Sequence, residues 1–88
     1  MKGREEFIKK LGNNIRKIRL DRNLSVEKLA LESGLAYSQI SRIELGKRNP
    51  TAFTLYKISN SLKCSPIDFF DGIHSTPPPN EQLDSYEP

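Results

Sequence analysis

The sequence is poor in the side chains from which most catalytic and metal sites are built. Its single cysteine, Cys64, excludes an internal disulfide and a cysteine-rich zinc site, and its single histidine, His74, has no second histidine as a co-ligand. A nucleophile needs an adjacent base, and the sequence offers neither such a pair nor a glycine-rich phosphate loop. Asp68 and Asp71 have helical spacing but are expected to cap and solubilise a terminal helix. We therefore expect no enzyme activity, no metal site and no cofactor.

Long apolar runs are also missing. No segment approaches the ~18 apolar residues that a membrane-spanning helix needs. The first residues, MKGREEFIKK, contain no long apolar stretch, so we expect no secretory signal. A reduced, cytoplasmic setting is the expectation that follows. In that setting Cys64 is expected to be a buried, inert thiol rather than a redox switch or ligand.

Charge divides the 88 residues into two unequal parts. Residues 1–71 carry all 14 lysines and arginines and have a net charge of +6, whereas residues 72–88 have a net charge of −3. The second part also contains three consecutive prolines, which is typical of an extended or disordered segment. We predict one domain over 1–71 and a flexible, proline-rich acidic tail over 72–88. A basic body is consistent with a polyanion partner, although many solvated helical domains are mildly basic too.

Apolar residues recur at helical spacing and no segment has the alternation of a strand, so the sequence predicts an all-α fold. In the first predicted helix, Phe7, Leu11 and Ile15 form one apolar stripe, while Gly12 lowers helix propensity in its middle by ~1 kcal/mol relative to alanine. The predicted helices cover residues 4–22, 26–33, 37–45, 51–62 and a short segment from 65.

The most informative segment runs from residue 25 to residue 46. Leu29 and Ala30 face inward from one short helix, and Ile40 and Ile43 face inward from the next. Gly34 lies between them, where the chain must reverse with a positive φ that glycine adopts without penalty. The opposite face of the second helix then carries Tyr37, Ser38, Ser41 and Arg42. This arrangement is that of a helix-turn-helix with a recognition helix.

On these residues the chain resembles the phage-repressor-like (XRE-type) helix-turn-helix regulators from about Leu11 to Phe70. The matching segments are IRKIR at 15–19, LSVEKLA at 24–30 and SGLAYSQISRIELGKRNP at 33–50. The resemblance implies a compact five-helix bundle of the lambda-repressor type that binds double-stranded DNA. It further implies a sequence-specific transcriptional regulator acting as a homodimer on an inverted-repeat operator. A phage-like repressor, a restriction–modification controller and an antitoxin all remain possible subtypes.

The resemblance assigns base contacts to the recognition helix. Tyr37, Ser38 and Arg42 align with positions that contact base edges in the family, and Ser41 can touch either a base or a phosphate. Arg42 can place two donors on guanine O6 and N7, a pairing worth ~1–3 kcal/mol of discrimination. Tyr37 can pack on a thymine methyl group or reach a phosphate. The alternative is an ordinary solvent-exposed helix face.

Phosphate contacts are expected around this helix. Lys47, Arg48 and Asn49 follow it in a loop that should lie along the DNA backbone, unless the loop is simply a solvated basic turn. Thr51 precedes a helix, and the amides of such a terminus suit a phosphate. Val26 stands where the family often has glutamine, so only its backbone amide can serve. Gln39 can contact a phosphate or support the neighbouring helix.

The resemblance also implies a structural ion pair between Arg19 and Glu44, joining the first and third helices; the alternative is two independent surface charges. The dimer interface is expected at the fifth helix, with Ile67, Phe69 and Phe70. Two adjacent phenylalanines cannot both enter the same small core, so one should meet a partner subunit or the tail.

Two other functions fit the same scaffold. One is a protein-interaction module with weak or no specific DNA binding, in which the acidic tail orders on a protein partner. The other is nonspecific coating of DNA. The leading hypothesis predicts that Arg42→Ala lowers specific DNA binding, whereas a protein-interaction module would retain its partner affinity.

Overall fold

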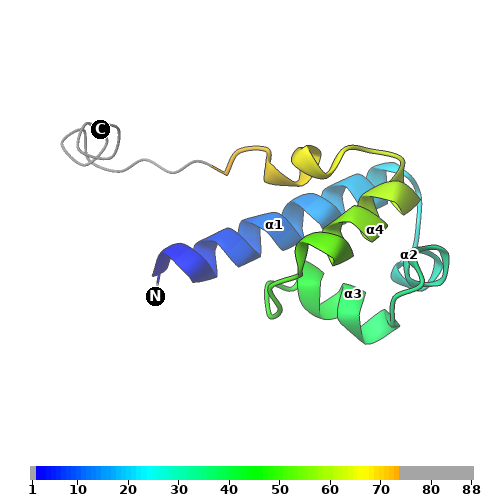
Figure 1. Ribbon diagram of the computed structural model, residues 1–88, viewed down its shortest axis with the longest axis horizontal. Helices are drawn as coiled ribbons and strands as arrows, with labels where there is room; N and C mark the ends of the chain where they lie inside the picture. The colour runs from blue at the N-terminus through cyan, green and yellow to red at the C-terminus, as the bar shows by residue number, and fades with distance from the viewer. Residues whose placement is uncertain (1, 74–88) are drawn as a thin grey trace.

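The computed structural model describes residues 2–73, and within them every regular element is a helix (Figure 1). The elements are α1 (Lys2–Asp21), α2 (Val26–Ser33), α3 (Tyr37–Glu44), α4 (Ala52–Leu62) and the 3-10 helix η1 (Pro66–Phe70). The all-α prediction is therefore confirmed for this part of the chain. Most of the predicted acidic tail, residues 74–88, lies outside the described residues.

The prediction of a five-helix bundle needs a correction, because the fifth element is a short 3-10 helix and not an α-helix. Its start is as expected: the Ser65 Oγ accepts from the Ile67 N–H at 3.3 Å, and Asp68 Oδ2 accepts from the Ser65 N–H at 3.1 Å. Its length is limited by Asp71, whose backbone is already non-helical at φ −59° and ψ 129°. Only five residues are left between these two points, too few for a stable α-helix.

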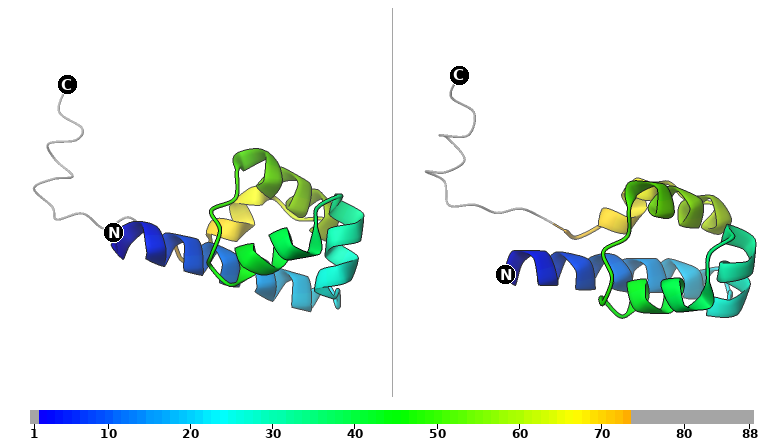
Figure 2. Two further views of the ribbon diagram at one scale, coloured as in Figure 1. Left: turned by 90° about the horizontal axis from the view of Figure 1, so that it is seen from below. Right: turned by 60° about the horizontal axis from the view of Figure 1, so that its bottom comes forward.

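The long helix α1 is the element against which α3 and η1 pack. It lies between α3 on one side and η1 on the other, while α2 packs against both α3 and α4 (Figure 1). The first turns of α1 extend beyond the other helices, as both views of Figure 2 show. The loop between α3 and α4 lies beside this part of α1.

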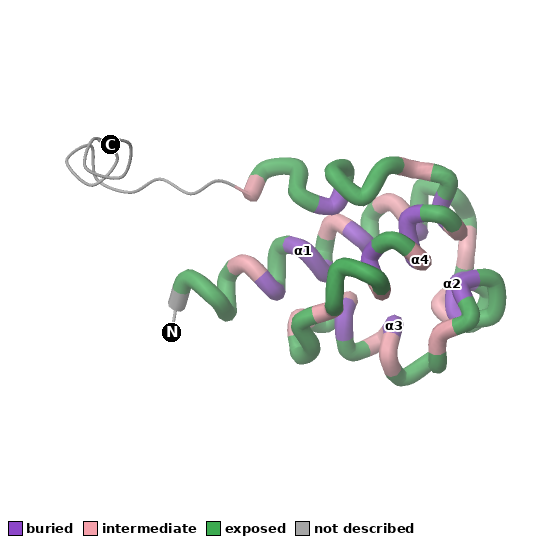
Figure 3. Tube along the Cα trace, viewed as in Figure 1, coloured by how far each residue is buried: buried purple, intermediate pink, exposed green. Residues whose placement is uncertain are grey.

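A single hydrophobic core joins all five elements, and the buried positions are purple along the tube of Figure 3. The four apolar residues predicted to hold α2 against α3 are all part of it, and α4 contributes apolar residues at helical spacing. The buried residues of this core are Leu11, Ile15, Leu29, Ala30, Ile40, Ile43, Leu55, Ile58, Leu62 and Phe69. In α1 the buried set also includes Ile8, whereas Phe7 and Ile18 are only half-buried.

Helix α1 continues through Gly12 without a break. A Cβ at this position would overlap the carbonyl oxygen of Ile43 and lie 3.0 Å from that of Glu44. Glycine therefore allows the end of α3 to approach the backbone of α1, and this packing compensates for its low helix propensity.

Two polar side chains, Asn14 in α1 and Arg22 just after it, hold the C-terminal part of the fold in place. The Asn14 Nδ2 donates to the carbonyl oxygens of Phe69 at 2.9 Å and Asp71 at 2.8 Å. The Arg22 Nε donates to the Leu62 carbonyl oxygen at 2.9 Å, which caps the end of α4. These bonds fix η1 on α1 with Phe69 directed into the core.

Candidate nucleic-acid interface

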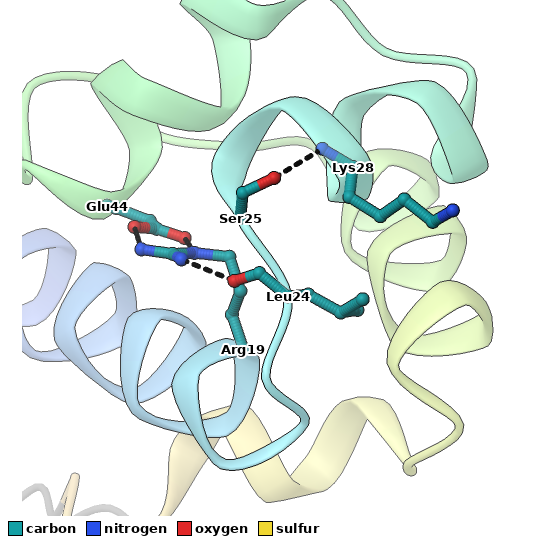
Figure 4. Close-up of polar contacts among 5 residues, drawn as sticks. All are labelled: Arg19, Leu24, Ser25, Lys28 and Glu44. Carbon is teal, nitrogen blue, oxygen red and sulfur yellow. Dashed lines mark hydrogen bonds and ion pairs between the residues drawn. The ribbon is translucent and has the colours of Figure 1, made fainter.

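Local backbone signals build the α2–α3 pair as the sequence predicts. The Ser25 Oγ accepts from the Lys28 N–H at 3.0 Å and caps α2 (Figure 4). At the other end Gly34 has φ 73° and ψ 21°, the left-handed conformation in which glycine carries no Cβ penalty. The Leu35 N–H then returns to the Ala30 carbonyl oxygen at 3.1 Å, which reverses the chain into α3.

Helix α3 has one buried face and one exposed face. Ile40 and Ile43 are fully buried, while 56% of the Tyr37 surface is exposed. Ser38 and Arg42 are also exposed, and Ser41 is half-buried at the edge. We refer to Tyr37, Ser38, Ser41 and Arg42 as the α3 face. It presents a phenol, two hydroxyls and a guanidinium to the outside of the molecule.

Gln39 supports the start of its own helix, α3, and not the neighbouring helix, which was the alternative that the sequence left open. Its Oε1 accepts from the Ala36 N–H at 3.1 Å and so satisfies an amide at the start of α3. Only its NH2 group is then left to meet an acceptor outside the protein.

The loop after α3 carries exposed Lys47, Arg48 and Asn49. Gly46 has φ 73°, and the next amide, that of Lys47, donates to the Arg42 carbonyl oxygen at 2.9 Å. This left-handed ending turns the basic loop away from the helix axis directly after the α3 face.

Helix N-termini lie at both ends of this region. The Thr51 Oγ1 accepts from the Thr54 N–H at 3.1 Å and caps α4. Val26, the first residue of α2, is half-buried and packs against the core. Its side chain is thus a packing group, and only its amide is suited to an anion.

The ion pair implied for Arg19 and Glu44 is present and nearly buried, with side-chain exposures of 8% and 5% (Figure 4). Arg19 Nε donates to Oε2 at 2.7 Å and Nη2 donates to Oε1 at 2.9 Å, a bidentate geometry. The third donor, Nη1, reaches the Leu24 carbonyl oxygen at 2.7 Å. The hydrogen bond to Glu44 raises the pKa of Arg19, against the opposing effect of burial. One guanidinium therefore joins α1, α3 and the segment before α2.

Of the three residues expected at a dimer interface, one lies in the core and two lie at the surface. Phe69 has no exposed surface and belongs to the core, so its assignment to an interface is corrected. Ile67 is 73% exposed and Phe70 is 37% exposed. The Phe70 ring also lies 6.0 Å from that of Phe7, measured between centroids.

Cys64 is half-buried rather than buried, and the pKa of its thiol is raised, chiefly by burial and also by nearby Asp68. Within residues 2–73, no group of three or more histidine, cysteine or acidic side chains is arranged to hold a metal ion. No helix in that range is long and apolar enough to cross a membrane.

Sequence reasoning missed the role of two glycines that fit α1 to the end of α3. Gly12 receives the last carbonyls of α3, and a Cβ at Gly46 would lie 2.9 Å from the Cα and 2.7 Å from the Cγ of Lys9. A glycine in the middle of a strongly periodic helix was the available signal for Gly12, because such a residue usually has a packing reason. Nothing in the sequence pointed to the contact between Gly46 and Lys9.

Two short helices joined at a left-handed glycine, the second with an exposed polar face, define a helix-turn-helix protein. The helix-turn-helix family (HTH_3) matches residues 15–69. The chain belongs to this XRE-type family of DNA-binding transcriptional regulators.

Individual relatives include both general regulators and control proteins. The chain is 32% identical over 69 residues to the HTH-type transcriptional regulator y4dJ of Sinorhizobium fredii, covering 78% of this chain and 90% of y4dJ. It is 44% identical over 61 residues to the control protein C.BamHI of Bacillus amyloliquefaciens, covering 68% of this chain and 75% of the relative. A crystal structure of the restriction–modification controller protein C.Esp1396I, a tetramer in complex with its natural 35 base-pair operator, is similar with a TM-score of 0.68 and 37% identity. That match covers 74% of this chain and 86% of the other.

Proposed function

We propose that the protein is a sequence-specific regulator that binds double-stranded DNA as a homodimer, with α3 in the major groove of each half of an inverted repeat. The observation that carries this proposal is the α3 face, which is exposed while Ile40 and Ile43 of the same helix are buried. The operator complex of the similar controller C.Esp1396I supports it. Together with the similarity to C.BamHI, that complex favours a restriction–modification controller among the three subtypes, acting on DNA in the cytoplasm.

Within the α3 face, each side chain has a chemistry suited to base edges. Arg42 offers two parallel N–H donors that match the O6 and N7 acceptors of guanine. Tyr37 offers an apolar ring for a thymine methyl group and a hydroxyl that can reach a phosphate. Ser38 and Ser41 both donate and accept, so they tolerate several bases.

Phosphate contacts would fix the register of this helix without reading sequence. Lys47, Arg48 and Asn49 supply donors from the loop directly after α3. The amides at the capped N-termini, around Val26 and Thr51, provide partial positive charge at two further points. The NH2 group of Gln39 is a further donor, since its Oε1 already accepts from Ala36.

Dimerisation supplies the information that one short helix lacks, because a single α3 contacts only a few base pairs. Two copies related by a two-fold axis would read half-sites about one helical turn apart. The exposed Ile67, with Phe70 three residues further along η1, is the apolar surface that we assign to the contact between subunits.

The test compares Arg42→Ala with Arg48→Ala on a recovered binding site and on a scrambled duplex at one salt concentration. Loss of the bidentate guanine contact should reduce the preference for the specific duplex by about 5- to 150-fold for each half-site, equivalent to ~1–3 kcal/mol per half-site. Arg48→Ala removes a phosphate contact and should weaken both duplexes by the same factor. Binding is measured by fluorescence anisotropy of labelled DNA.

An unchanged preference in Arg42→Ala would contradict base reading by this helix. If the wild type bound no DNA while it retained affinity for a protein partner, the scaffold would instead be a protein-interaction module. Equal wild-type affinity for both duplexes would indicate nonspecific coating of DNA.

A further inference from the structure

We propose that Lys9, on α1, is an additional phosphate-contacting residue that extends the basic loop after α3. This inference rests on the proposed DNA-binding function and adds to it a contact from a helix outside the helix-turn-helix pair. Lys9 precedes the segment that the family match covers, which begins at residue 15.

The position of Lys9 follows from its packing against Gly46. A Cβ on Gly46 would meet the Lys9 side chain at Cγ, 2.7 Å away, and the Lys9 backbone at Cα, 2.9 Å away. The lysine stem therefore lies against the loop at the one residue that has no side chain to displace it. Three residues further along α1, Gly12 receives the carbonyls of Ile43 and Glu44, so both contacts hold the end of α3 on one face of α1.

The ammonium group of Lys9 is carried beyond this contact. Three bonds separate Nζ from the Cγ that lies against Gly46, and lysine commonly buries its methylene stem while its charge remains in water. Lys9 is exposed and forms no ion pair with any of residues 2–73. Lys47 and Arg48 follow Gly46 directly in the chain, so with Lys9 against Gly46 the three cations would form one basic strip.

Lys10 provides a matched control on the neighbouring position. Its Nζ lies 3.5 Å from the Gly72 carbonyl oxygen, which places it toward the end of η1. Lys9 and Lys10 thus share charge, exposure and helix, and differ in the part of the molecule that their side chains reach.

The experiment measures the salt dependence of binding for the full chain and its Lys9→Ala, Lys9→Arg and Lys10→Ala variants. Because a homodimer carries two copies of Lys9, the variant should lose two phosphate contacts, which reduces the slope of log Kobs against log salt by about 1.8. Over a fourfold rise in salt, the affinity of Lys9→Ala should therefore fall about 12-fold less than that of the wild type. The loss should be equal for specific and scrambled duplexes, and Lys9→Arg and Lys10→Ala should keep the wild-type slope.

A wild-type slope in Lys9→Ala would overturn the inference, even if its affinity or its melting temperature decreased. That result would mean that Lys9 only supports the loop. A reduced slope in Lys10→Ala of the same size would also overturn it, because any surface cation would then have the same effect. Failure of the wild type to bind DNA at all would be a different result, since it would remove the proposed function itself.

Discussion

At the scale of single residues, Gly12 controls how closely the helix with the exposed polar face approaches α1. The carbonyl oxygens of Ile43 and Glu44 occupy the space that any side chain at position 12 would need. Backbone atoms at the end of a packed helix cannot move aside as a flexible side chain would. A methyl group at this position should therefore separate α1 from α3.

We expect Gly12→Ala to lower the free energy of unfolding by about 1–3 kcal/mol, the usual cost of overpacking a core. The decrease should occur although alanine improves helix propensity by ~1 kcal/mol. Gly3→Ala is the control, because a Cβ at that helical position would meet no atom within 4 Å. Urea unfolding followed by circular dichroism measures both variants. Equal stability of Gly12→Ala and the wild type would contradict the packing explanation.

Residue roles that depend on local chemistry could be predicted from the sequence. Ser25 and Thr51 cap their helices through hydrogen bonds to amides three residues on, and Gly34 adopts its left-handed turn. Such roles need only short-range geometry. From the sequence, Gly12 could be recognised only as a weak helix former. Its contact with the end of α3 could not be predicted, because the carbonyl groups that it meets are distant in the sequence.

At the scale of elements, the Arg19–Glu44 pair sets how α3 is held on α1. Its geometry is bidentate, both side chains are nearly buried, and Arg19 also binds the Leu24 carbonyl oxygen ahead of α2. A buried pair of this kind contributes little net stability compared with apolar residues of similar volume. Its effect is on orientation, since breaking it leaves one charge without a partner.

Removing one partner should be far more damaging than removing both. We expect Glu44→Leu or Arg19→Met alone to cost about 3–5 kcal/mol, and the double variant to cost much less than their sum. A double-mutant cycle from chemical denaturation measures this coupling. Additive losses would show that the two charges act independently, the alternative that the sequence left open.

All five predicted elements exist, but the type of the last one, at the C-terminal end, was predicted wrongly. Helices α2 to α4 have apolar residues at clear helical spacing, and their cores are as expected. The segment at Pro66–Phe70 has the capping residues of an α-helix but is only five residues long. Asn14 attaches it through the carbonyl oxygens of Phe69 and of Asp71, the next residue after the segment, and this contact has no sequence signal.

At the scale of the whole molecule, the DNA-binding account combines features from four elements. The α3 face would read bases, while the loop after α3, the N-termini of α2 and α4, and Lys9 of α1 would hold the DNA backbone. The family and the fold class could be identified from the spacing in residues 25–46. Operator sequence could not be predicted, because serine and tyrosine at the base-reading positions accept more than one base.

The proposed dimerisation is the property at this scale that would most change the function. Ile67 is the most exposed apolar residue of η1. A charged side chain at this position should oppose its burial against a second copy of the chain. The substitution Ile67→Asp should leave the core intact because Phe69, not Ile67, fills it.

Selection of bound sequences from a random DNA pool, with the full chain at moderate salt, is the sharpest test of whether α3 reads DNA sequence. The account predicts an inverted repeat with half-sites about one helical turn apart for the wild type. For Ile67→Asp it predicts a single half-site or much weaker enrichment. Recovery of no motif by folded wild-type protein would contradict the claim that α3 reads DNA sequence.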